Sequence, residues 1–469
     1  MVAQIQKSLR ESKTARWFAL ILISLTMFFA YFFVDVAAPL QTILERDHGW
    51  SPEVFGMLGG SEFFLNVFAF FLIISGIILD KMGIRFTIVT SGVAMVLGGA
   101  LKYYALTPGF ADTSLAHWLG TFFVNIPASA KLAFFGFAIF GIGVEMAGIT
   151  VSKTIVKWFK GKELALAMGL EMAVARLGVF AVFRLSPVFA EQGGVTNSVF
   201  WGVAFLCVGL LLFIVYTFMD LKLDREIGKD DNSEPEESFR ISDIWLILKN
   251  PGFIAIASLC VLFYSAIFPF QKFATDMLAS KLDIPIIDAA AMFSFFPILA
   301  MVLTPFIGAF LDKKGLGATM MLYGAILMTI SHLIFALVPA SAFNDVIGYL
   351  TIVVLGSAFS LVPASMWPSV PKIVEERFLG SAYGLIFWIQ NIGLLAVPIL
   401  IGWALSAANP GVSDAIAAGD LTAKYNYTVP ELIFAGFGVL AMIMSVVLKV
   451  VDKKRGFGLD LPNKVKKAE

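Results

Sequence analysis

The chain has 469 residues, of which 59% are hydrophobic and 14% are charged, and its formal net charge is zero. Soluble domains are about half apolar and about a quarter charged, so this composition excludes an ordinary soluble enzyme and places most of the chain in lipid. The balanced charge offers no footprint for a nucleic acid, and we expect none as a partner.

Twelve segments are long and apolar enough to cross a membrane, which takes about 20 mostly apolar residues. The first follows a basic segment and contains no small-residue cleavage site, which indicates a span and not a signal peptide. We therefore expect an all-α membrane protein with twelve transmembrane helices. The expected spans are 17–39, 54–79, 86–106, 132–156, 164–190, 198–219, 251–270, 289–311, 318–338, 346–371, 379–405 and 430–450.

Residues 220–249 form the only long polar stretch, and they divide the chain into two sets of six expected spans. We expect a six-helix bundle over 1–219, a cytoplasmic linker over 220–249, and a second bundle with a cytoplasmic tail over 250–469. Residues 241–248 have the pattern of a short amphipathic helix on the membrane surface, although a solvated linker fits equally well. With the N-terminus inside, 25 of the 34 Lys and Arg residues fall on the inner side, which predicts cytoplasmic termini.

The two halves share a loop sequence. GIILDKMG at residues 76–83 follows the second span, and GAFLDKKG at residues 308–315 follows the eighth. Gly76 and Gly83 allow a tight turn and close helix approach. We expect Asp80, and Asp312 in the second copy, to meet a helix N-terminus or a basic side chain of the other half and hold the cytoplasmic side shut. A plain turn is the alternative reading of each copy.

This loop resembles the cytoplasmic motif of the major facilitator superfamily, to which Asp80 and Arg85 conform. Ile84 replaces the usual arginine, and the second copy has no arginine. The resemblance implies two six-helix bundles that rock around a central substrate site, with Asp80, Arg85 and Asp312 acting as gating residues.

Further motifs resemble the lysosomal dipeptide-transporter branch of that superfamily. They are GVE at 143–145, WFKGKEL at 158–164, ARLG at 175–178, WP at 367–368, LGSAYG at 379–384 and IQNIG at 389–393. In that branch a glutamate of span four and an arginine of span five bind the two charged ends of a dipeptide. The resemblance assigns these roles to Glu145 and Arg176, while Val144 stands where the branch usually has a glycine.

The residues themselves support such a pair. Glu145 and Arg176 each stand about 18–20 Å into their spans, near the membrane midplane. A charge there is unfavourable by about 2.5–3.5 kcal/mol and usually faces a cavity. Glutamate suits an ammonium and the planar guanidinium suits a carboxylate, so a zwitterion could bridge them. The alternative is a structural salt bridge between the two spans.

Other polar positions within the spans are expected to contribute less. Glu62 in the second span lines an access path, titrates or is simply interfacial. Lys153 is expected to extend toward the cytoplasmic surface. The second half has no clear midplane charge, and its candidate substrate contacts form a neutral and partly aromatic wall. They are Gln390, Asn391, Trp367 and Trp388, although a tryptophan in a membrane helix more often serves in packing.

We expect a uniporter for dipeptides or similar small zwitterions. One alternative is a transporter of organic or inorganic anions, possibly proton-coupled, that uses Arg176 alone. Another is a non-transporting sensor built on the same fold. No nucleophile and base are arranged for catalysis, so we expect no enzyme, and no metal or other cofactor. Compact loops favour a bacterial inner membrane over a lysosomal one, and a monomer is expected. The sequence does not indicate an accessory subunit.

Overall fold

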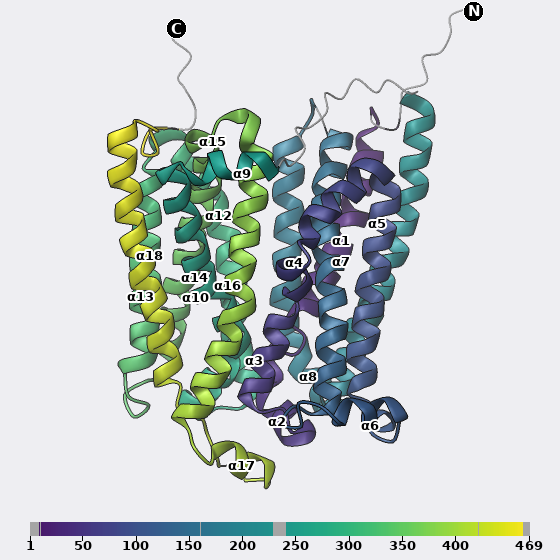
Figure 1. The fold of residues 1–469 in the computed structure, drawn as a ribbon, viewed down its shortest axis with the longest axis vertical. Coiled ribbons are helices and arrows are strands. Elements are labelled where there is room, and N and C mark those ends of the chain that lie inside the picture. The colour runs from purple at the N-terminus through teal and green to yellow at the C-terminus, as the bar shows by residue number, and fades with distance from the viewer. Residues whose placement is uncertain (1–8, 10, 160, 228–240, 421, 463–469) are drawn as a thin grey trace, which may run out of the picture.

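The computed structural model describes residues 9, 11–159, 161–227, 241–420 and 422–462, and every regular element among them is a helix. Figure 1 shows helices α1–α8 gathered in one half of the molecule and α10–α18 in the other. The first half contains α1 (Lys13–Val34), α2 (Gln41–His48), α3 (Pro52–Ser61), α4 (Phe64–Phe68), α5 (Phe71–Ala105), α6 (Ser114–Gly120), α7 (Ala128–Phe159) and α8 (Leu164–Ile227).

The short helix α9 (Ile241–Leu248) lies between the halves in sequence and covers the predicted amphipathic segment. The second half contains α10 (Pro251–Leu282), α11 (Ile286–Phe293), α12 (Phe295–Lys314), α13 (Gly317–Leu337), α14 (Asp345–Met366), α15 (Val370–Ile373), α16 (Leu379–Ala408), α17 (Val412–Ala417) and α18 (Thr428–Arg455). We name the two ends of the molecule after their short helices. The α9 side carries α9 and α15, and the α17 side carries α2, α6 and α17 (Figure 1).

Ten helical stretches of the described chain are long and apolar enough to span a membrane. Two of them contain breaks, at Gly83 in α5 and at Gly193 and Gly194 in α8. A straight helix of 64 residues would be about 96 Å long, three times the thickness of a bilayer core. The break in α8 therefore favours two passes in that stretch, and the break at Gly83 separates the end of the expected second span from the third. The number of twelve stays a prediction. Large apolar side chains such as Phe218 and Phe306 are exposed, as expected for a surface in contact with lipid.

The expected second span is built from separate pieces. Helix α3 ends at Ser61, α4 covers only five residues, and α5 begins after Phe70. Phe70 has a φ of 50°, in the left-handed region that bulky residues avoid. Its ring stacks on Trp388 of α16 at 5.4 Å between centroids. The Trp388 Nε1 group donates a hydrogen bond to the Val67 carbonyl (3.0 Å), so the break is held by the other half of the molecule.

Helices α3 and α16 lie side by side toward the α17 side (Figure 1). Their backbones touch at three glycines because no side chain separates them. A Cβ atom added at Gly56 would lie 2.2 Å from the Pro398 carbonyl oxygen, and one at Gly60 would lie 2.3 Å from the Leu395 oxygen. A Cβ at Gly402 would lie 2.2 Å from the Pro52 oxygen. We call this contact the glycine seam.

Candidate functional site

The predicted pair of charges occupies two helices of the first half. Glu145 lies near the middle of α7, and Arg176 lies twelve residues, or about 18 Å, after the start of α8 at Leu164. Both side chains are partly exposed within the bundle. Glu145 forms no hydrogen bond or ion pair with any described residue, and no ion pair joins it to Arg176. The alternative of a structural salt bridge between the two spans is therefore not realised in this conformation.

Arg176 contacts the second half of the molecule. Its guanidinium carbon lies 4.7 Å from the centre of the Phe359 ring on α14, within the range of a cation–π interaction. Such a contact stabilises the charge while leaving the planar N–H donors free for an anionic group. The arginine therefore stands at the boundary between the halves.

An aromatic cluster surrounds Phe359. Tyr264 of α10 packs edge-on against Phe359 and accepts a hydrogen bond from Trp367 Nε1 (3.1 Å). Trp367 stacks on Phe387 at 4.8 Å, and its carbonyl accepts a hydrogen bond from the Tyr383 hydroxyl (3.2 Å). The predicted aromatic wall is thus larger than Trp367 alone. We call these five side chains the aromatic wall.

Gln390 and Asn391 are both buried on α16. The Gln390 Oε1 atom accepts a contact from the Cys260 thiol of α10 at 3.5 Å, so this side chain is engaged in packing between α16 and α10. The role of both residues as substrate contacts stays a prediction.

Glu62 belongs to a buried network of charges between the halves. Lys272 of α10 lies 2.8 Å from Asp35 Oδ1 and 3.8 Å from Glu62 Oε2, and it donates a hydrogen bond to the Val34 carbonyl (3.0 Å). Gln271 donates to the second oxygen of Asp35. That the second half has no charge at the membrane midplane stays a prediction, because Lys272 lies about 32 Å along α10, toward the α17 side. Helix α10 continues to Leu282, well past the expected end of that span, and carries Lys272 into the interface.

Two further residues of this region had no sequence signal. Lys102 is buried with its ammonium 4.1 Å from the centre of the Phe137 ring, and it interacts electrostatically with Glu62 and Lys272. Tyr31 of α1 lies within electrostatic range of Arg176, Glu145 and Glu62, and also of Glu171, which stands on α8. Tyr31 is therefore near the predicted pair and adds a hydroxyl to this region of the first half.

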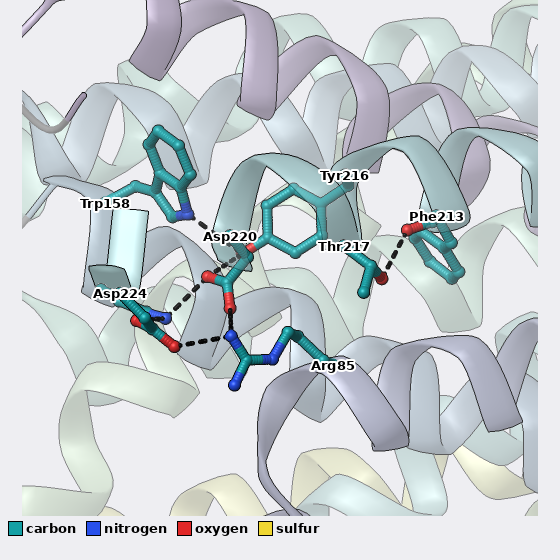
Figure 2. A network of polar contacts seen from close by, with 8 residues as sticks. Arg85, Trp158, Phe213, Tyr216, Thr217, Asp220 and Asp224 are labelled. Atoms are coloured by element: carbon teal, nitrogen blue, oxygen red, sulfur yellow. Dashed lines mark hydrogen bonds and ion pairs between the residues drawn. The ribbon is translucent and has the colours of Figure 1, made fainter. Parts of the chain in front are cut away.

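The predicted gating residues of the first half are paired within that half. Asp80 binds Lys153 of α7 at 2.7 Å, so Lys153 is an ion-pair partner and not a side chain extended freely to the surface. The expected contact of Asp80 with the other half is absent among the described residues. Arg85 lies 2.9 Å from Asp224 and 4.0 Å from Asp220, as Figure 2 shows.

Glycines shape this loop in different ways. Gly83 has a φ of 78° and forms the break in α5, whereas Gly76 is helical and has no atom within 4 Å of an added Cβ.

The second copy of the loop, after Asp312, is covered by the C-terminal segment. The amide of Leu316 donates to the Asp460 carbonyl (2.9 Å), and the amide of Gly317 donates to the Leu459 carbonyl (3.2 Å).

The WFKGKEL motif anchors the turn between α7 and α8; its Lys160 lies outside the described residues. Trp158 Nε1 donates to the Tyr216 hydroxyl (3.0 Å), which in turn donates to Asp220 (Figure 2). Glu163 lies 3.2 Å from Arg16 of α1. A hydrogen bond from its own backbone amide and the Arg16 guanidinium lower the pKa of Glu163. The motif therefore fixes the helix turn at a distance from Glu145 and Arg176.

A family model for the Major Facilitator Superfamily matches residues 20–398 of this sequence. The chain belongs to the Major Facilitator Superfamily. This confirms the resemblance seen in the loop motif. As a member of the Major Facilitator Superfamily, the chain is a multi-pass membrane transporter that works by alternating access, and not an enzyme.

Curated relatives within the superfamily share this length and layout. The chain is 27% identical over 454 residues to the lysosomal dipeptide transporter MFSD1 of Danio rerio, an alignment that covers 92% of this chain and 86% of the relative. It is 26% identical over 464 residues to the protein of the same name from Homo sapiens, covering 95% and 88%. These are the relatives that the branch motifs indicated.

Solved structures of other superfamily members show the same fold. The nucleoside transporter NupG superposes with a TM-score of 0.65 at 15% identity, covering 92% of this chain and 99% of that one. A bacterial homolog of the human lysosomal transporter Spinster, in an inward-facing and occupied conformation, superposes with a TM-score of 0.63 at 15% identity, covering 94% and 98%.

Proposed function

We propose that this transporter moves dipeptides or similar small zwitterions by uniport. The observation that carries the proposal is that Glu145 and Arg176 are both partly exposed and unpaired with each other, at matched depth within one half. An extended dipeptide separates its ammonium from its carboxylate by about 6 Å, so one molecule can contact two such groups. The names of the relatives support the same substrate class.

We further propose that the α9 side is cytoplasmic, because most Lys and Arg residues fall on that side of the expected spans. The α17 side is sealed by the glycine seam and by the buried network around Lys272. A substrate would therefore reach Arg176 from the α9 side in this conformation. The compact loops favour a bacterial inner membrane over a lysosomal one.

Uptake into proteoliposomes tests the assignment when the two ends of the substrate are modified separately. N-acetylation removes the ammonium of a dipeptide, and C-amidation removes its carboxylate. If Glu145 binds the ammonium, Glu145→Gln transports the free dipeptide poorly and loses most of its discrimination against the acetylated form. If Arg176 binds the carboxylate, Arg176→Lys loses its discrimination against the amide. A charged hydrogen bond contributes about 1.5–3 kcal/mol, so KM rises about 10- to 100-fold.

Matched controls use charges that lie outside the site. Glu191→Gln changes an exposed glutamate of α8, and Arg377→Lys changes an exposed arginine beyond α15; both are expected to transport like the parent. Unchanged KM and unchanged discrimination in Glu145→Gln and Arg176→Lys would refute the site. Competition by monocarboxylates but not by dipeptides would instead support an anion transporter.

A further inference from the structure

One buried carboxylate from each half of the molecule lies at the contact between the halves on the α17 side. Glu45 is on α2 of the first half, and Asp276 is on α10 of the second. Their exposed fractions are 1% and 6%. Asp276 lies within electrostatic range of Glu45, so Glu45 is buried near a group of the same sign. They meet only because the halves are in contact here.

Glu45 is held by neutral donors alone. Its Oε1 atom accepts hydrogen bonds from the Ser413 hydroxyl of α17 and from the Tyr425 hydroxyl (2.7 Å), both in the second half. Its Oε2 atom is buried and has no hydrogen-bond partner among the described residues. An ionised carboxylate would bury an uncompensated negative charge here, whereas a protonated one buries only a neutral polar group, which is much less unfavourable.

Asp276 has the same kind of environment. It accepts hydrogen bonds from the Thr42 hydroxyl of α2 and from the Tyr427 hydroxyl (2.6 Å). Tyr427 also contacts the Gln41 Oε1 atom at 3.3 Å. The Gln41 Nε2 atom is also buried and has no hydrogen-bond acceptor among the described residues. The side chains of this region therefore leave a second buried polar atom without a partner.

No described cation forms an ion pair with Glu45 or Asp276. None of the charged and titratable groups on the neighbouring elements neutralises Glu45 or Asp276. Each is acidic, is engaged with another partner, or forms no ion pair with the two carboxylates. They are Arg46 with Asp47, His48 beside Trp50, Glu53 on α3, Arg184 with Ser294, Lys272 with Asp35 and Glu62, Lys281 with the Phe335 carbonyl, Asp414 on α17, Lys424 with Asp283, and Glu431 with His332.

We propose that Glu45 and Asp276 form a proton-binding site that fills when the α17 side closes. When the halves separate on this side, both carboxylates face the solution and ionise; when the halves close, burial beside each other without a cation favours the protonated forms. Acidic solution on the α17 side therefore stabilises the closed state, and this stabilisation is lost as the pH rises. The protons return to the same solution at each opening, so the site regulates a uniporter and does not drive it.

The proposal requires only alternating access and does not depend on the substrate. Its test is accordingly made without substrate, by electron–electron distance measurements in lipid nanodiscs. Spin labels at Gln192→Cys and Val346→Cys report on opposite halves of the α17 side, where both positions are exposed. Cys207 and Cys260 are replaced by serine in all samples. The measured quantity is the ratio of the population with long label-to-label distances (open) to the population with short distances (closed), as a function of pH.

Linkage sets the expected result. If closing takes up one proton, the ratio of open to closed molecules rises about tenfold per pH unit over the titration range, and about a hundredfold if both carboxylates titrate together. Glu45→Gln and Asp276→Asn each reduce this slope and favour the closed state at every pH, because the amides are neutral. Asp288→Asn, an exposed carboxylate at the start of α11, keeps the parent slope.

Several outcomes would overturn the proposal. The first is a ratio that does not change with pH in the parent protein, a result that needs no variant to fold. The second is an unchanged slope in the Glu45→Gln/Asp276→Asn double variant. The third is a ratio that responds to Na⁺ at fixed pH and not to pH itself, because that would assign the two carboxylates to a metal cation.

Discussion

Substitution of Gly56 by alanine should open the α17 side. The new Cβ atom would lie 2.2 Å from the Pro398 oxygen, 3.0 Å from the Pro398 carbonyl carbon and 3.3 Å from the Ile399 Cα atom. All three are backbone atoms, so no side chain can rotate away and α3 must separate from α16. Overpacking of this kind destabilises by about 1–3 kcal/mol. The strain exists only while the halves touch here, so the closed state is disfavoured by about 5- to 150-fold.

The distance measurement described above reads this change directly. Gly56→Ala should increase the population with long distances between labels at Gln192 and Val346, and it should lower the rate of transport, because closing becomes the slow step. Gly148→Ala is the matched control. Gly148 lies on α7 and has no atom within 4 Å of an added Cβ, so this alanine should leave both the distances and the rate unchanged.

The reasoning fails if Gly56→Ala and Gly148→Ala give the same distance distribution. It also fails if Gly56→Ala lowers the thermal stability of the protein by the expected amount without changing the distances, since the strain would then be absorbed within one half.

Three other substitutions have clear expected outcomes. Asp35→Asn removes the nearer carboxylate from the buried Lys272 ammonium and leaves Glu62 at 3.8 Å, so it should destabilise by up to about 3–5 kcal/mol. Asp35→Asn with Lys272→Met should recover much of the loss in thermal unfolding. Phe359→Leu removes the cation–π contact with Arg176, which contributes about 0.5–2 kcal/mol, and should raise KM about 2- to 30-fold. Phe359→Tyr keeps the ring and should transport like the parent. Asp80→Asn breaks the exposed ion pair with Lys153, which contributes at most about 1 kcal/mol to stability. The variant should therefore change the transport rate while its free energy of unfolding stays within about 1 kcal/mol of the parent. A large loss of stability would contradict a gating role.

The sequence predicts best those features that are visible along one helix. Charges such as Glu145 and Arg176 are conspicuous within apolar runs, and their depth follows from counting residues from the end of each span. The helix over Ile241–Leu248 also follows from its local pattern. The loop at 76–83 was recognised from its repeat at 308–315, and Gly83 does adopt the left-handed conformation that the tight turn requires.

Contacts between the halves are harder to predict, because they join residues more than 100 positions apart. Lys272 was placed outside the membrane because the expected span ended at residue 270, and only the position of Asp35 in space explains why the lysine is buried. Phe359 is one of 46 phenylalanines, and nothing in its neighbourhood distinguishes it from lipid-facing rings. The same holds for Glu45, whose partners come from a segment near residue 425.

The two copies of the repeated loop are secured by different forces, and this has a consequence for ionic strength. Around residues 80–85 the contacts are ion pairs between side chains that are about a third to a half exposed, such as Asp80 with Lys153 and Arg85 with Asp224. Around residues 316–317 backbone hydrogen bonds to the C-terminal segment are present as well, beside one ion pair, of Lys449 with Asp460. Salt screens exposed charges over about 10 Å at 0.1 M but has little effect on backbone pairing. High salt should therefore loosen the α9 side of the first half while leaving that of the second half in place.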